Sequence, residues 1–229
     1  MKWLLPTCFA LPAFAAPVTY TLAPPSTIDV RVYKDGIAQG LAHDHVMRAS
    51  AVSGTITYDP DTRQLLGVRI EVDATRLEVD PPRVRHLYGM DNDLDADDRA
   101  EIGANMRAQD QLNVEAFPKI TFESKTFGVA PDGRIDLGGQ LTLRGQTRDV
   151  RLPVAIWATP ERLQGKGSLR IRHTDFGFQP YSALGGAIRN QDRIDLIISL
   201  SAEAPAPPPA PPSAPPPAAP SAPPTTPGE

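Results

Sequence analysis

A two-residue alternation of apolar and polar side chains, which recurs between Val18 and Ala204, constrains the fold more than any other feature. In one segment Val68, Ile70 and Val72 alternate with charged residues. This period is typical of strands with one buried and one solvated face. The strands that it predicts cover residues 28–33, 46–58, 68–73, 120–129, 141–144, 150–156, 163–172 and 194–200.

Turn residues separate these segments and predict antiparallel neighbours. The turns expected are Asp59-Pro60-Asp61, Pro131-Asp132-Gly133 and Gly145-Gln146. Gly138-Gly139 and Pro153 would weaken a flat central strand, but they suit a bend, a bulge or an edge. We therefore expect an all-β fold, an eight-stranded antiparallel barrel whose interior is filled by side chains or holds one small ligand.

One segment departs from the two-residue period. Residues 95–110 place Ile102 and Met106 four apart, begin with acidic residues and carry Arg107 near the end. This charge distribution favours a helix because it complements the helix dipole. The sequence therefore predicts one short helix that caps the barrel.

The two ends of the chain differ from the middle. Residues 1–15 join Lys2 to a short apolar run and end in Ala13-Phe14-Ala15, which predicts a cleaved signal peptide and a periplasmic location. Residues 205–229 are almost entirely Pro and Ala, which predicts a disordered tail. The tail could act as a spacer or as a ligand for a proline-binding module. Alternatively, it is a solubilising terminus. Residues 16–204 remain as a single domain.

Composition and motifs exclude several classes of function. The net charge is −4 and no Lys/Arg cluster occurs, so nucleic acid is not expected as a partner. Cys8, the one cysteine, lies in the expected signal, which leaves no thiol in the mature chain. The acidic run 91–95 lacks the glycine and the closing glutamate of a calcium loop, since Ala96 and Ile102 stand there. No catalytic motif is found, and we expect no enzyme activity and no cofactor.

The histidines are the main chemical candidates. A spacing of two on a strand would point His43 and His45 to one face, although they are out of phase with Ile56 unless a bulge intervenes. His173 shares the parity of Leu169 and Ile171, which places it on the interior face. These rings could bind a polar head group or a metal, or they could be exposed or structurally hydrogen-bonded. The metal alternative would use His43, His45 and His173, with His86 as a further ligand.

Scattered aromatic residues could line a lipid tunnel or pack as ordinary core. The residues expected to bind ligand are His43, His45, Phe117, Phe122, Leu143, Trp157, His173, Phe176 and Tyr181. None of them is assigned a catalytic or metal-binding role.

Three segments in order carry a resemblance to a known family. They are Val114-Glu115-Ala116-Phe117-Pro118-Lys119-Ile120-Thr121-Phe122, Leu141-Thr142-Leu143-Arg144-Gly145-Gln146-Thr147-Arg148 and Asp175-Phe176-Gly177. With them the chain resembles the YceI family of lipocalin-like bacterial proteins over nearly all of residues 18–204. The resemblance implies a lipocalin-like eight-stranded barrel, export, and a polyisoprenoid chain bound inside. The chain departs from better-known members at Ala42-His43-Asp44-His45, at Pro180-Tyr181-Ser182-Ala183-Leu184-Gly185-Gly186 and in its tail.

The function expected is a periplasmic carrier of a long apolar ligand, a polyisoprenoid or an isoprenoid quinone. Such a carrier would be a monomer or dimer with a transient partner in the envelope or inner membrane. Two alternatives remain: a histidine-based metal-binding or redox-linked envelope protein, and an interaction module that works through its tail.

Overall fold

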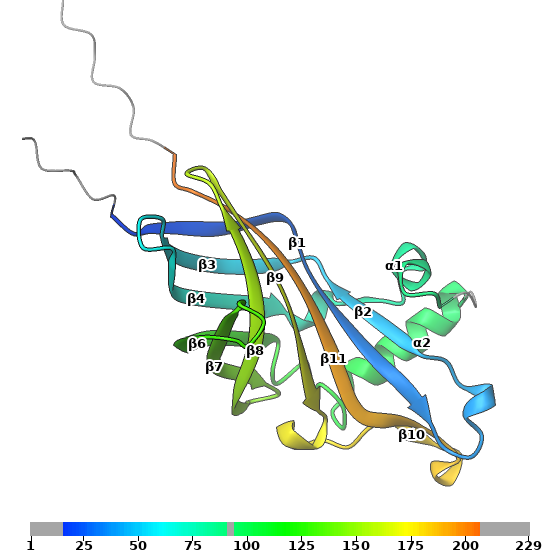
Figure 1. The fold of residues 1–229 in the computed structure, drawn as a ribbon. Helices are drawn as coiled ribbons and strands as arrows, with labels where there is room; N and C mark the ends of the chain where they lie inside the picture. The colour runs from blue at the N-terminus through cyan, green and yellow to red at the C-terminus, as the bar shows by residue number, and fades with distance from the viewer. Residues whose placement is uncertain (1–15, 91–93, 207–229) are drawn as a thin grey trace, which may run out of the picture.

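The computed structural model describes residues 16–90 and 94–206, in which eight antiparallel strands form a closed barrel (Figure 1). They are β1 (Val18–Asp35), β3 (Val52–Asp59), β4 (Gln64–Asp73), β6 (Lys119–Val129), β7 (Ile135–Leu143), β8 (Gln146–Ala158), β9 (Arg162–Arg172) and β11 (Ile188–Glu203). Each strand pairs with the next one in this order, and β11 pairs with β1 to close the sheet. The all-β, eight-stranded antiparallel barrel predicted from the alternation is confirmed, as is the lipocalin-like form that the resemblance implies.

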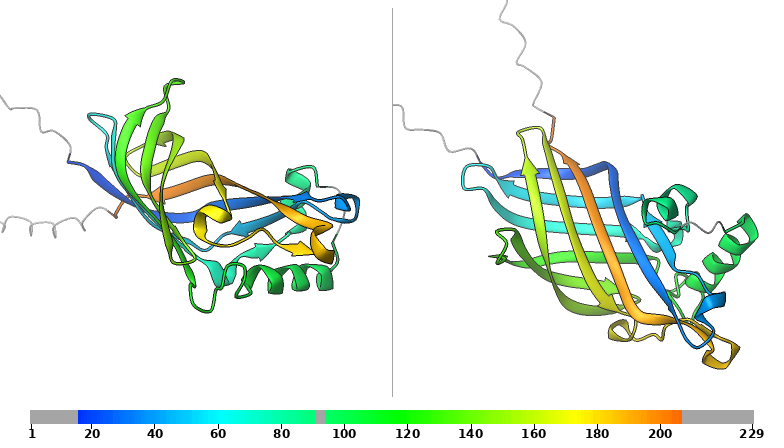
Figure 2. Two further views of the ribbon diagram at one scale, coloured as in Figure 1. Left: turned by 90° about the horizontal axis from the view of Figure 1, so that it is seen from below. Right: turned by 45° about the vertical axis from the view of Figure 1, so that its right-hand side comes forward.

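Strand β1 has different neighbours along its length. Its residues 18–21 pair with β3, and its residues 28–32 pair with β2 (His45–Ala49), which in turn pairs with the short β5 (Glu78–Val79). The single strand expected over residues 46–58 is therefore wrong, because Ser50 and Ala51 divide it into β2 and β3. As a result, β1, β2 and β11 extend beyond the other strands at one end of the barrel (Figure 2).

The opposite end, where the described chain begins and ends, is closed by packing. Tyr20, Leu163 and Ala202 have no exposed surface. The Tyr20 hydroxyl donates a hydrogen bond of 2.9 Å to the Thr159 carbonyl in the turn between β8 and β9. Since a buried tyrosine hydroxyl needs such a partner, the bond fixes the ring across this end.

Helix α2 (Ala96–Arg107) lies at the extended end (Figure 2). Asp95 caps it by accepting a bond of 2.8 Å from the Asp98 amide, and Asp98 accepts in return from the Asp95 amide at 3.3 Å. Arg107 donates to the Leu77 carbonyl at 3.0 Å, which fastens the last turn to the barrel. The helix predicted from the acidic start and basic end is confirmed.

The smaller elements surround the same end. Helix α1 (Pro82–Leu87) covers the outer face of β2, where Val84 packs against Val46 and Met90. The remaining elements are 3-10 turns at Gln39–Leu41, Ala74–Arg76, Thr174–Phe176 and Leu184–Gly186, and the strand β10 (Ser182–Ala183). No helix in residues 16–90 and 94–206 is long and apolar enough to cross a membrane.

Two glycine positions shape the wall formed by β6, β7 and β8. Arg144 and Gly145, with φ of 51° and 70°, form the two-residue turn that joins β7 to β8. The turn begins one residue before the Gly145-Gln146 turn expected from the sequence. Opposite Gly138-Gly139, β6 carries a register shift between Ser124 and Thr126. A Cβ atom at Gly139 would lie 2.6 Å from the Phe122 ring, so the glycine makes room for this ring.

Candidate ligand-binding cavity

The barrel contains two adjoining chambers. The outer chamber, beside α2, has a volume of about 180 Å³, and the inner chamber has a volume of about 130 Å³. Both are lined by Val30, Leu77, Ile120, Leu141 and Leu196, so the two chambers adjoin each other. An apolar cavity of about 150 Å³ holds a benzene ring. The two chambers together therefore suit an elongated molecule better than a single ring.

The inner chamber is almost entirely apolar. Its wall includes Ile28, Ala49, Ile56, Leu65, Val68, Ile70, Val72, Phe122, Leu137, Leu152, Val154, Ile156, Leu169, Ile198 and Leu200. Thr121 and Lys166 are the polar residues along it. A polar group buried in such surroundings would lose its hydrogen bonds to water without replacement. This chamber therefore suits a hydrocarbon.

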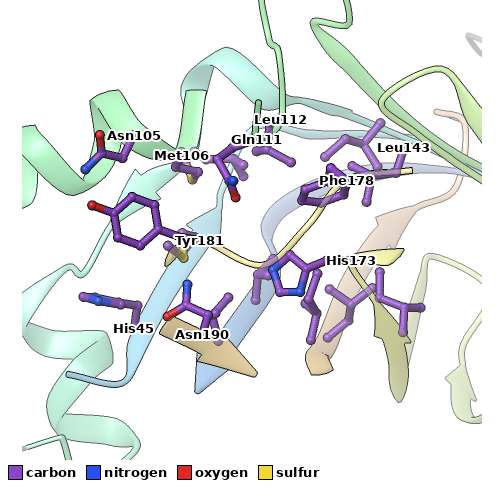
Figure 3. A pocket seen from close by; sticks show the side chains of 18 of the residues that line it. His45, Asn105, Met106, Gln111, Leu112, Leu143, His173, Phe178, Tyr181 and Asn190 are labelled. Carbon is purple, nitrogen blue, oxygen red and sulfur yellow. The ribbon is translucent and has the colours of Figure 1, made fainter. Parts of the chain in front are cut away.

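The outer chamber combines apolar walls with polar side chains from several elements (Figure 3). The polar residues are His45 of β2, Asn105 of α2, Gln111, His173, Tyr181 and Asn190 of β11. Gln111 donates to the Gln179 carbonyl at 3.3 Å. The cavity is thus apolar inside and polar where it approaches the extended end of the barrel.

His45 is held by a buried carboxylate. Its Nδ1 lies 2.7 Å from Oδ2 of Asp80, a residue with 0% exposure. The other oxygen of Asp80 accepts from Arg85 Nη1 at 2.7 Å and from the Val46 amide at 3.0 Å. Burial raises the pKa of Asp80, but the hydrogen bonds from His45, Val46 and Arg85, together with the charge of His45, outweigh it and lower the pKa below its usual value. Asp80 is therefore a carboxylate near neutral pH.

His173 lies just after β9 and is 5% exposed. Its Nδ1 is 3.1 Å from the Asp192 carbonyl, and its ring meets Phe178 edge-on with centroids 5.1 Å apart. Burial lowers the pKa of His173, because desolvation disfavours the charged imidazolium. The ring is consequently neutral at neutral pH.

Arg144 holds the loops around the outer chamber together. From the turn between β7 and β8 it donates to the carbonyls of Gly177 and Gln109, each at 2.9 Å. Its guanidinium also lies 5.7 Å from the ring centroid of Phe178, which lines the chamber. One side chain thus joins a hairpin to the loops that follow α2 and β9.

Five of the nine residues expected to bind ligand line the cavity. Phe122 lies in the inner chamber, and His45, Leu143, His173 and Tyr181 lie in the outer one.

The other four lie elsewhere. Phe117, 36% exposed, covers the turn at Gly145, and Trp157 is 56% exposed at the end of β8. Phe176 belongs to the packed core with 1% exposure. His43 precedes β2, so the expectation that His43 and His45 share one face of a strand is wrong.

Several cavity residues were not expected from the sequence. Asn190 has the parity of Ile194 and Leu196 on β11, and this signal could have identified it. Asp80 and Arg85, which do not line the chambers, gave no comparable signal, because Asp80 contacts His45 from a distant part of the chain and Arg85 in turn contacts Asp80.

The positions of the histidines bear on the alternative in which they bind a metal ion. In the part of the chain that the structure describes, no group of three or more His, Cys, Asp or Glu side chains is arranged to hold a metal ion. Nδ1 of His45 lies within hydrogen-bond distance of the Asp80 carboxylate, and Nδ1 of His173 lies within hydrogen-bond distance of the Asp192 carbonyl. His86 is exposed on α1.

Comparison with known proteins identifies the family. The model of the YceI-like domain matches residues 26–202. The chain belongs to the YceI-like family. Among curated proteins no match is found.

Two solved structures share the fold. BcnA from Burkholderia cenocepacia is 14% identical, with a TM-score of 0.56 over 77% of this chain and 95% of BcnA. The YceI protein from Campylobacter jejuni is 16% identical, with a TM-score of 0.51 over 69% of this chain and 83% of that protein. At these identities the likeness concerns the fold of the YceI-like barrel.

Proposed function

We propose that this YceI-like barrel is a non-catalytic carrier of one long apolar ligand, a polyisoprenoid or an isoprenoid quinone. The hydrocarbon tail occupies the inner chamber, and the polar head stays in the outer chamber. The observation that carries the proposal is that an apolar inner chamber adjoins an outer chamber with polar side chains. This arrangement matches an amphiphile.

The energetics favour a long tail. Burial of one methylene contributes about 0.8 kcal/mol, and association costs about 4–15 kcal/mol. Since an isoprene unit has five carbons, burial of roughly one to four units offsets that cost. A short metabolite would instead need polar anchors, which the inner chamber does not supply.

The proposal includes a location, the periplasm. The support is the Ala13-Phe14-Ala15 pattern at the end of residues 1–15, which lie outside the described residues. A partner in the envelope or inner membrane would load or receive the ligand.

Native mass spectrometry of protein purified from its own envelope tests the proposal. The expected result is one lipid per barrel, released by organic solvent and identified as an isoprenoid. A barrel that arrives empty, and stays empty after incubation with isoprenoid lipids, would refute it. A bound metal in place of a lipid would favour the histidine-based alternative.

A further inference from the structure

Two loops at the extended end of the barrel carry large apolar side chains that are exposed to water. Residues 36–42 follow β1, and residues 184–187 join β10 to β11. The loops lie side by side (Figure 2), and the Ala38 amide donates to the Ala187 carbonyl at 2.9 Å. We call the two segments together the apolar tip. Its large side chains are Ile37, 97% exposed, Leu41, 75% exposed, and Leu184, 74% exposed.

The apolar tip carries no charge, and the charges at its base cancel. Its other residues are glycine, alanine and Gln39. Arg189 forms an ion pair of 2.9 Å with Asp35, which ties the two loops together. Lys34 and Asp44 add one charge of each sign, and the Lys34 amide donates to the Asp44 carboxylate at 3.0 Å. A surface of this kind is not attracted to an anionic partner by charge.

The main chain of the apolar tip is hydrogen-bonded within the tip itself. The bonds run from the amide of Gln39 to the carbonyl of Gly36, from Leu41 to Ala38, from Ala42 to Gln39 and from Ala187 to Leu184, at 2.9–3.3 Å. A loop is costly to move out of water chiefly because its peptide groups lose their hydrogen bonds. These internal bonds lower that cost.

Leu184 has a backbone conformation that packing does not explain. Its φ of 50° lies in the left-handed region, which is rare for a bulky residue. Gly185 and Gly186, which adopt positive φ without strain, follow it directly. Since the side chain is mostly exposed, it gains little from contacts within the barrel. Strain of this kind points to a function for the side chain.

The size of the apolar tip favours a lipid surface over a protein partner. Burial of one leucine or isoleucine removes roughly 100 Å² of apolar surface, so three remove roughly 300 Å², whereas a stable protein interface needs about 800 Å² from each partner. A bilayer needs no matching surface, and it binds in proportion to the apolar area that enters it. The outer chamber is close by, since its residues Tyr181 and Asn190 are joined by a main-chain bond of 2.9 Å beside the loop 184–187.

We propose that the apolar tip is a membrane-docking surface, which inserts into the interface of a lipid bilayer and holds the outer chamber beside it. Its three large side chains enter the boundary between head groups and acyl chains. An apolar ligand then passes between bilayer and barrel with little exposure to water. This use rests on the proposed function, whereas docking itself needs no bound ligand.

Vesicle binding of protein purified from the envelope tests the inference. Co-sedimentation with phosphatidylcholine vesicles that contain no isoprenoid measures the affinity. Ile37→Ser should weaken binding roughly tenfold, because one side chain no longer enters the lipid. Val129→Ser is the matched control and should leave binding unchanged, since Val129 is 83% exposed but β6 ends far from the apolar tip (Figure 1).

A second variant separates docking from folding. Leu184→Gly removes the side chain and relieves the strain at a φ of 50°. It should weaken vesicle binding roughly tenfold without lowering the midpoint of urea unfolding. Phosphatidylglycerol in the vesicles should not strengthen the binding of the wild-type protein, because the apolar tip and its base have no net charge.

The outcomes separate the two proposals. If the wild-type protein does not bind vesicles, or if Ile37→Ser and Leu184→Gly bind them as tightly as the wild type, the docking surface is overturned and the carrier function stands. A wild-type dimer that Ile37→Ser converts to a monomer would also overturn it, since the tip would then join two copies of the chain. Vesicle binding by a protein that takes up no isoprenoid would overturn the carrier function alone.

Discussion

Asp80, which has no exposed surface, accepts a hydrogen bond of 2.7 Å from Nδ1 of His45, 35 residues earlier in the chain. This contact joins the start of β2 to the segment just after β5. The same carboxylate accepts from Arg85 and from the Val46 amide. One buried residue therefore orients a cavity side chain and connects β2 to α1.

Replacement of Asp80 should destabilise the barrel. Asp80→Asn removes the charge that balances the buried Arg85, and loss of one partner from a buried pair costs about 3–5 kcal/mol. Urea unfolding measures the change. As a control, Asp132→Asn breaks an exposed pair with Arg134 and should leave the unfolding midpoint almost unchanged. Equal effects of the two substitutions would contradict the structural role assigned to Asp80.

Gly165 of β9 offers a way to fill the inner chamber. The residue is buried and lines the chamber, and a Cβ atom added there meets no other atom within 4 Å. We expect Gly165→Leu to fold with little loss of stability and to reduce isoprenoid binding at least tenfold, because it takes the space of the tail.

The neighbouring residue provides the matched control. Gln164 is exposed on the same strand, so Gln164→Leu should leave binding unchanged. If Gly165→Leu folds and still binds the lipid with wild-type affinity, the inner chamber is not the site of the tail.

Stability should decrease in mild acid because of His173. An unfolded histidine has a pKa near 6.5, and burial lowers the pKa of His173 in the folded protein. As the pH falls below about 6.5, the unfolded chain therefore binds the proton first and folding is disfavoured. Urea unfolding at about pH 7.5 and about pH 5.5 measures this loss.

Two variants test the assignment to His173. His173→Gln should reduce the pH dependence, and only in part, since the pKa of His43 is also lowered by burial and by the charges of His45 and Arg85. Gln164→Leu, at an exposed position of β9, leaves every titratable group in place and should not reduce it. If the stability of His173→Gln decreases with falling pH as much as that of the wild-type protein, other groups cause the loss of stability.

The proline-rich tail should not contribute to the stability of the barrel. β11 ends at Glu203, and the Ala204 amide donates to the Glu161 carbonyl at 2.8 Å, which completes the pairing at that end. Truncation after Ala204 should leave the melting temperature nearly unchanged. A decrease of more than about 4 °C, roughly 1 kcal/mol or slightly more for a domain of this size, would show that the tail packs against the fold.

Export should produce a mature chain that begins at Ala16. Ala13 and Ala15 flank the expected cleavage site in the small-x-small pattern of signal peptidase substrates. N-terminal sequencing of protein from the native envelope checks this. An intact Met1 would rule out cleavage and with it the proposed location.

The sequence predicted most of the barrel because alternation reports which face of a strand is buried. Leu169 and Ile171 gave the parity that placed His173 inside. The capped helix α2 was equally visible from Asp95 and Arg107. The first half of β1 was not predicted, since Pro24 and Pro25 interrupt its alternation, although pairing with β11 continues on both sides of them.

The outer chamber was less predictable for a physical reason. Its polar residues come from β2, α2, β11 and loops, and their proximity depends on tertiary contacts instead of periodicity. The break at Ser50-Ala51 changes the parity between His45 and Ile56, which resolves the phase conflict seen in the sequence. Helix α1 has six residues, too few for a recognisable helical period.

The contacts of Arg144 bear on how this barrel can diversify. Because its guanidinium binds main-chain carbonyls of Gly177 and Gln109, the attachment does not depend on the side chains of the two loops. Substitutions in those loops can therefore accumulate during evolution without detaching them from the hairpin. The lining of the outer chamber can in this way change while the apolar inner chamber remains the same.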